Sequence, residues 1–142
     1  ASPEDCERLY QYGYNLGLAF QIADDWLDTY GDPAVFGKAI GGDIVNNKKS
    51  WLMTRAFEKA SASTRQELLS AMSMPIETEE QKAAKITTVK AIYAELGLDE
   101  EAKQEIQRLH NQAMAHIAAL GLPEEKADTL RNYAAALISR NK

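Results

Sequence analysis

The stretch that decides the fold is residues 17–28, which read Gly17-Leu18-Ala19-Phe20-Gln21-Ile22-Ala23-Asp24-Asp25-Trp26-Leu27-Asp28. On a helical wheel with about 100° per residue, four of them fall within about 60° of one another. These four are Gly17, Gln21, Asp24 and Asp28. Apolar side chains cover most of the remaining helix surface, which is typical of a buried helix. The stretch therefore predicts a buried helix whose narrow polar stripe faces a wet internal cavity.

Helical periodicity extends outward from this stretch over the rest of the chain. We expect a first helix at about 4–30 with Ser2 as its cap, a glycine-rich loop at 37–43, a second helix from 46 or 47, and a short helix at 63–72. Three amphipathic helices follow, and no stretch shows the sustained alternation of a strand. The 142 residues therefore predict an all-α helical bundle in which 1–142 form a single domain.

Local signals place the ends of the later helices. Thr78 and Gln81 form a capping-box pattern at the start of one helix. Gly97 is expected to end that helix, Asp99 to cap the next one, and Gly121 to end it in turn.

The composition narrows the classes of function. The formal net charge is −5, which argues against a general nucleic-acid-binding surface. Charged residues interrupt every apolar run before it reaches the roughly 18–20 residues that a membrane span needs. The single cysteine, Cys6, has no partner for an internal disulfide and fits a reducing cytosol. We therefore expect a cytoplasmic protein that neither binds nucleic acid nor spans a membrane.

The carboxylates of Asp24, Asp25 and Asp28 are the strongest functional signal. A solvated charged face is the ordinary explanation for an acidic run. Against it, Asp24 and Asp28 lie four residues apart, where like charges repel, and in the last turns of a helix whose dipole disfavours anions. A divalent cation would offset both penalties. Hard carboxylate oxygens, with no His or Cys in the cluster, suit Mg²⁺ rather than Zn²⁺, so the cluster predicts a Mg²⁺ site.

Three lysines form the basic counterpart of this cluster. Lys38 lies in the glycine-rich loop, and Lys48 and Lys49 lie at an expected helix start, where backbone N–H groups and glycines let an anion approach closely. A surface loop with ordinary lysines explains these residues equally well when they are taken alone. Together with the carboxylates, they predict a Mg²⁺–diphosphate site in which the lysines neutralise charge that the metal leaves.

The order of these residues resembles the second aspartate-rich region of the trans-prenyltransferases, the family of the farnesyl and geranylgeranyl diphosphate synthases. The matching elements are Gly17-x-x-Phe20-Gln21-x-x-Asp24-Asp25-x-x-Asp28, Gly31-Asp32-Pro33, Gly37-Lys38, Gly42-Asp43-Ile44 and Asn47-Lys48-Lys49-Ser50-Trp51. They cover about residues 13–55, and the later helices are compatible with the family but carry little specific signal. The resemblance implies the C-terminal half of the isoprenoid synthase fold, an all-α bundle around a deep cavity.

The resemblance also implies an activity, a Mg²⁺-dependent head-to-tail condensation. Isopentenyl diphosphate would attack the carbocation that remains when an allylic substrate loses its diphosphate, and Mn²⁺ could replace Mg²⁺. A homodimer is implied as well. The implied residue roles are metal binding for Asp24, Asp25 and Asp28, diphosphate binding for Lys38, Lys48 and Gln21, and catalysis for Asp24, Lys38 and Lys48. Lys49 adjoins the family's lysine position.

One departure from the family pattern limits this interpretation. The family's first aspartate-rich motif and its basic residues for isopentenyl diphosphate are missing from this chain. We therefore expect the 142 residues to be the C-terminal part of an enzyme, inactive alone, whose exposed half-cavity pairs with itself or with other copies. Two alternatives stay open: a terpene cyclase, whose second metal motif usually mixes Asn, Ser and Glu, and a non-catalytic partner subunit of a prenyl synthase.

Overall fold

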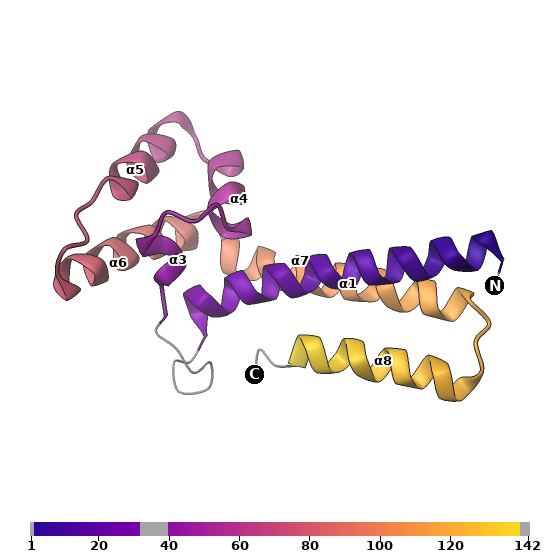
Figure 1. The fold of residues 1–142 in the computed structure, drawn as a ribbon. Coiled ribbons are helices and arrows are strands. Elements are labelled where there is room, and N and C mark those ends of the chain that lie inside the picture. Colours follow the sequence, from indigo (N-terminus) through magenta and orange to yellow (C-terminus); the bar gives the residue numbers. More distant parts are fainter. Residues whose placement is uncertain (1, 32–39, 140–142) are drawn as a thin grey trace. The chain divides into compact units, whose positions relative to one another are not determined.

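The computed structural model describes residues 2–31 and 40–139, with side chains described as far as residue 136. Every regular element in these ranges is a helix (Figure 1): α1 (Pro3–Tyr30), α3 (Gly42–Val45), α4 (Trp51–Lys59), α5 (Ala62–Met72), α6 (Glu79–Glu95), α7 (Leu98–Ala119) and α8 (Glu124–Ser139). The all-α prediction is confirmed for this part of the chain. None of the described helices has the length and apolar character that crossing a membrane requires.

Two predicted helix starts are confirmed in atomic detail. The Ser2 hydroxyl accepts a hydrogen bond from the Asp5 N–H at 3.1 Å, which caps α1. At the start of α6, the Thr78 hydroxyl accepts from the Gln81 N–H at 3.1 Å, and the Gln81 side chain accepts from the Thr78 N–H at 3.1 Å. This reciprocal pair is the capping box that the sequence predicted.

Two other predicted starts are wrong. The chain makes the single turn of α3 and then bends at Asn47, whose φ of 55° lies in the left-handed region, so the next helix begins at Trp51 rather than at 46 or 47. Ser50 caps that helix through a 3.1 Å hydrogen bond from the Met53 N–H. Asp99 does not cap α7, because it already lies in the first turn and its carboxylate accepts from the Trp26 indole N–H at 2.6 Å.

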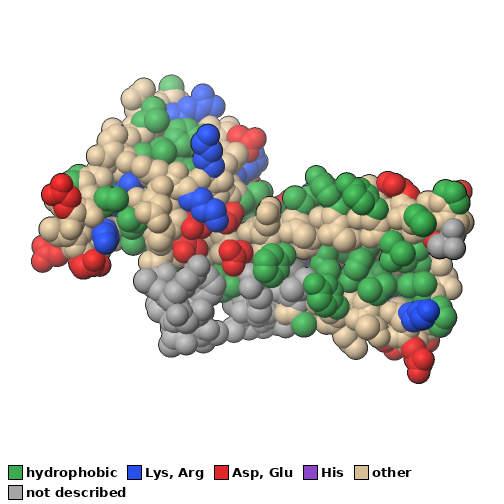
Figure 2. Space-filling view, viewed as in Figure 1, with side chains coloured by type: hydrophobic (Ala, Val, Ile, Leu, Met, Phe, Trp, Pro, Cys, Tyr) green, Lys and Arg blue, Asp and Glu red, His purple; other side chains and the backbone are tan. Residues whose placement is uncertain are grey.

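Internal contacts divide the chain into two compact units, and the first consists of residues 1–23 and 103–142. Its core joins α1, α7 and α8 (Figure 1) and contains Tyr12, Leu16, Ala113, Ile117, Ala127 and Ala134. The Tyr12 hydroxyl donates to the Leu130 carbonyl at 2.8 Å, so the buried phenol is satisfied. Hydrophobic side chains also gather on the surface of this unit (Figure 2), and the exposed ones include Leu9, Tyr10 and Tyr14.

The second unit, residues 24–102, contains the end of α1, the helices α3 to α6 and the start of α7. Its buried side chains include Ile44, Leu52, Leu68, Val89, Tyr93 and Leu98. The short helix α3 packs against α6 at Gly41, where φ is 94° and an added Cβ would lie 2.5 Å from the Ile86 Cδ1. Glycine is therefore required there for both backbone conformation and space. That residues 1–142 fold as a single domain stays a prediction.

Candidate functional site

The polar stripe of α1 runs from open surface into the interior. Gly17 and Gln21 are exposed, Asp24 is partly buried, and Asp28 retains only 5% of its accessible surface. Asp25 is buried as well, at 9%. The buried apolar side chains of α1, which include Leu16, Ile22 and Leu27, confirm the prediction of a largely buried helix, whereas a wet internal cavity along the polar stripe stays a prediction. Buried carboxylates are costly unless hydrogen bonds or cations compensate them, so their partners define the site.

Asp28 fastens the start of α3 to the end of α1. Its Oδ2 accepts a hydrogen bond from the Asp43 N–H at 2.8 Å. Its backbone carbonyl accepts from the Gly41 N–H at 2.5 Å. One aspartate thus binds two backbone groups of the segment that enters α3.

Asp25 binds the start of α4 and also pairs with the ammonium group of Lys48. Its Oδ2 accepts from the N–H of Trp51, the first residue of α4, at 2.8 Å. Its Oδ1 accepts from the Lys48 Nζ at 3.1 Å. A carboxylate at a helix N-terminus is stabilised by the helix dipole, and the ammonium adds a charge-assisted hydrogen bond. These contacts explain how Asp25 can be buried.

Lys48 lies between two carboxylates but still reaches solvent. Its Nζ is 3.1 Å from Asp25 and 3.5 Å from the Asp43 Oδ2, and 49% of its side chain is exposed. The hydrogen bond with Asp25 raises the pKa of Lys48, which therefore carries its charge at neutral pH. Burial and the nearby Asp28 carboxylate raise the pKa of Asp43. The Lys48 ammonium is consequently held by two carboxylates, while its exposed side remains accessible to a ligand.

The oxygen donors suit Mg²⁺ in kind. Asp24, Asp25, Asp28 and Asp43 offer carboxylate oxygens, the hard ligands that Mg²⁺ prefers. Within the described ranges, no three Asp, Glu, His or Cys side chains are arranged to hold a metal ion by themselves. Mg²⁺ commonly takes one or two protein carboxylates and completes its octahedral shell with phosphate oxygens and water.

The structure brings only some of the predicted site residues together. Asp25, Asp28 and Lys48 meet around Asp43, whereas Gln21 lies exposed further back along α1. Lys38 falls within 32–39, outside the described residues. Lys49 lines a separate, largely apolar surface pocket of about 560 Å³ together with Phe57 and Arg65.

Sequence reasoning assigned no site role to Asp43 and missed three residues that support the site. Ser50 caps α4 directly before the Trp51 N–H that binds Asp25. Tyr93, on α6, is 1% exposed and hydrogen-bonds the Ser50 side chain, and burial raises the pKa of its phenol. Lys85 is also 1% exposed on the buried face of α6. A lysine in the apolar stripe, four residues before Val89, was the signal that could have revealed it.

The comparison with protein families covers this whole cluster. The sequence model of the polyprenyl synthetases matches residues 1–96, about two thirds of the chain and all of the contacts around Lys48. The chain belongs to the polyprenyl synthetase family. The family resemblance predicted from the aspartates, glycines and lysines is therefore confirmed, and the all-α helices are part of an isoprenoid synthase fold.

Individual relatives of this polyprenyl synthetase chain support the same family membership. A farnesyl pyrophosphate synthase from Bos taurus is 37% identical over 108 residues, which are 76% of this chain and 29% of that enzyme. A geranylgeranyl pyrophosphate synthase crystal structure matches with a TM-score of 0.85 and 35% identity, over 100% of this chain and 43% of that one. Another, from Corynebacterium glutamicum in complex with isoprenyl diphosphate and magnesium, has a TM-score of 0.79 and 30% identity, over 99% and 39%. The chain thus spans less than half the length of these relatives.

Proposed function

We propose that this chain supplies the second aspartate-rich part of a trans-prenyltransferase active site. The reaction would be the head-to-tail condensation of isopentenyl diphosphate with an allylic diphosphate, which yields a longer linear isoprenoid diphosphate. The observation that carries the proposal is the position of Lys48, held by Asp25 and Asp43 but half exposed. The solved relative that contains isoprenyl diphosphate and magnesium supports the choice of ligand class.

In this proposal Asp24 and Asp28 hold Mg²⁺, and Asp25 takes an outer position. Both oxygens of Asp25 already accept hydrogen bonds, from Trp51 and Lys48, so we assign it contact with the ion through water. When bound, Mg²⁺ supplies neutralisation of the negative charge that develops on the departing diphosphate. Mn²⁺ is the alternative ion.

Lys48 is proposed to bind the diphosphate of the allylic substrate. An ammonium has three N–H donors, so Lys48 can keep its bond to Asp25 and still donate to phosphate oxygens. Because Asp25 fixes the ammonium before substrate arrives, little reorganisation is needed when charge develops on the leaving group. Lys38, which lies outside the described residues, and Gln21, on α1, are proposed to bind the same diphosphate.

The experiment measures binding of inorganic pyrophosphate to this chain in excess Mg²⁺ by titration calorimetry. Lys48→Met keeps the length of the side chain and removes its charge, and we expect at least about a tenfold loss of affinity, equivalent to about 1.4 kcal/mol. Lys49→Met is the matched control, because it removes the same charge from the adjacent residue, and should change affinity less than about twofold. Equal losses in the two variants would contradict the assignment of Lys48.

A further inference from the structure

Lys85 is a buried lysine whose hydrogen bonds go to backbone carbonyls. It lies on α6 with 1% of its surface exposed. Its Nζ donates to the carbonyls of Val45 and Met72, each at 3.2 Å. Val45 is the last residue of α3 and Met72 the last residue of α5. Carbonyls in the last turn of a helix lack partners within the helix, and the negative end of the dipole favours a cation there.

Helix α3 is held at both ends. Asp28 binds the Asp43 N–H where α3 begins, and Lys85 binds the Val45 carbonyl where it ends. After α3, the Lys48 N–H donates to the Asp43 carbonyl at 2.9 Å. The backbone of Lys48 is thus anchored to α3, so the position of α3 sets where the Lys48 side chain starts toward Asp25.

A second hydrogen bond reinforces the connection to α5. The Asn47 side-chain amide donates to the Met72 carbonyl at 3.1 Å, the same carbonyl that Lys85 binds. Asn47, whose φ is 55°, lies directly before Lys48. Lys85, on α6, and Asn47, in the turn after α3, therefore bind the same carbonyl at the end of α5.

We propose that Lys85 is a positioning residue of the diphosphate site: its ammonium joins the C-terminal ends of α3 and α5 and so holds Lys48 opposite Asp25. Lys85 touches neither substrate nor metal in this scheme and acts through α3. The link to diphosphate binding rests on the proposed function, whereas the anchoring of α3 does not.

The test compares Lys85→Met with the unsubstituted chain. Methionine keeps a similar length and apolar contacts but cannot donate, which leaves the Val45 carbonyl without this partner. Amide hydrogen exchange is followed at Val45, Asn46 and Lys48, whose N–H groups donate to the Gly41, Gly42 and Asp43 carbonyls. We expect exchange there to accelerate by about tenfold beyond any change in α8, and pyrophosphate affinity to fall by a similar factor of about ten.

Two further variants separate positioning from general stability. Lys82→Met is the matched control, because Lys82 lies on the same helix, pairs with Glu79 at 3.3 Å on the exposed side and loses the same charge. It should change neither exchange in α3 nor affinity. Lys85→Arg keeps a cationic donor and should recover much of the affinity. If Lys85→Met does not fold, Lys85→Gln, which keeps a shorter amide donor, should show the same two effects at smaller size.

The outcomes that overturn the proposal are distinct from failure of the proposed function. Unchanged exchange in α3, or accelerated exchange with unchanged pyrophosphate affinity, would overturn the positioning role of Lys85. If the unsubstituted chain does not bind pyrophosphate, the proposed function fails. The role of Lys85 is then decided by the carboxyl ¹³C resonance of Asp25, which must shift in Lys85→Met but not in Lys82→Met if Lys85 holds Lys48 in place.

Discussion

Asp24 is the residue on which the metal assignment depends most. It lies partly buried on α1, one helical turn before Asp28. We expect Asp24→Asn to fold without Mg²⁺, because asparagine keeps the size of the side chain and still forms hydrogen bonds. A ligand that binds only the folded state raises stability, so the rise in Tm with Mg²⁺ and pyrophosphate should be lost in this variant. Thermal unfolding with and without these ligands measures both effects.

The matched control for the Asp24→Asn variant is Glu95→Gln. Glu95 is an exposed carboxylate at the last position of α6, so its substitution also removes a negative charge near a helix C-terminus. The Tm of this variant should still rise with Mg²⁺ and pyrophosphate as it does for the unsubstituted chain. An equal rise in Asp24→Asn would show that Asp24 does not hold the ion.

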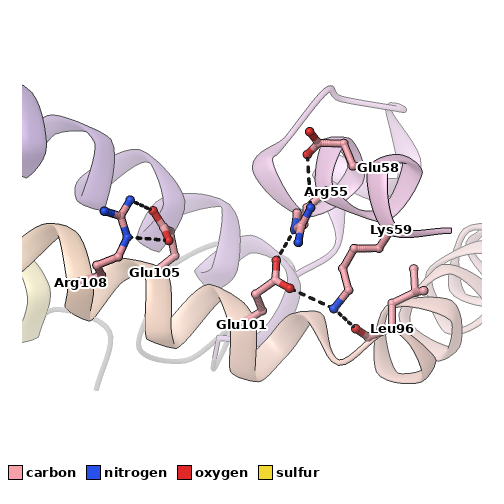
Figure 3. A network of polar contacts seen from close by, with 7 residues as sticks. All are labelled: Arg55, Glu58, Lys59, Leu96, Glu101, Glu105 and Arg108. Atoms are coloured by element: carbon pink, nitrogen blue, oxygen red, sulfur yellow. Dashed lines mark hydrogen bonds and ion pairs between the residues drawn. The ribbon is translucent and has the colours of Figure 1, made fainter.

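At the scale of elements, Glu101 joins α7 to α4 (Figure 3). Its carboxylate pairs with Arg55, and its Oε1 accepts from the Lys59 Nζ at 2.9 Å. Lys59 also donates to the Leu96 carbonyl at 2.7 Å, next to the junction of α6 and α7. Burial by itself would raise the pKa of Glu101, but the hydrogen bonds from Arg55 and Lys59 outweigh it and place the pKa below its ordinary value of 4.5.

The sign of the resulting pH dependence follows from this lowered pKa. The charged form of Glu101 is favoured in the folded state, so it adds about 1 kcal/mol to the free energy of unfolding, as expected for a partly exposed network. This stabilisation is complete above about pH 4.5 and is lost as pH falls through the folded pKa. In urea unfolding, Glu101→Gln should be less stable at neutral pH and approach the unsubstituted chain at acidic pH. Glu105→Gln, which removes only a local pair with Arg108 on α7 (Figure 3), should have a smaller effect. A difference for Glu101→Gln that stays constant down to low pH would contradict the role of its charge.

At the scale of the whole molecule, the chain covers 29% of the bovine synthase and 43% of the geranylgeranyl pyrophosphate synthase structure. The family's first aspartate-rich motif is not among its 142 residues. We therefore predict that the purified chain, given Mg²⁺, isopentenyl diphosphate and an allylic diphosphate, transfers no prenyl group, because the first aspartate-rich motif is missing. Chromatography of the diphosphate products measures this, with an intact family enzyme as the control. Robust formation of longer linear products would contradict the prediction.

Product analysis also separates the two alternatives once the missing motif is supplied on a second chain. Cyclic hydrocarbons would indicate a terpene cyclase. A second chain whose activity does not depend on Asp24 of this one would indicate a non-catalytic partner subunit. The homodimer and the cytoplasmic location stay predictions, and sedimentation of the purified chain measures the first of them.

Much of the helical architecture and half of the site were predictable from local patterns. Helical periodicity, the Ser2 cap and the Thr78–Gln81 capping box depend on residues at most a few positions apart, so they can be recognised without a fold. The spacing of Asp25 and Asp28 on one helix is likewise a local pattern that can be recognised without a fold. These features set the all-α class and located the acidic side of the site.

Packing between segments that are distant in the sequence determined the other contacts of the site and the turn after α3. The pairing of Asp25 with the Trp51 N–H joins residues 26 positions apart, and that of Lys85 with the Val45 carbonyl joins residues 40 positions apart. No local pattern encodes such a distance, because it depends on how α1, α4 and α6 pack. For the same reason the segment expected to begin a helix at 46 or 47 is a turn: the Asn47 and Lys85 side chains bind the Met72 carbonyl, which lies 25 and 13 positions away from them in the sequence.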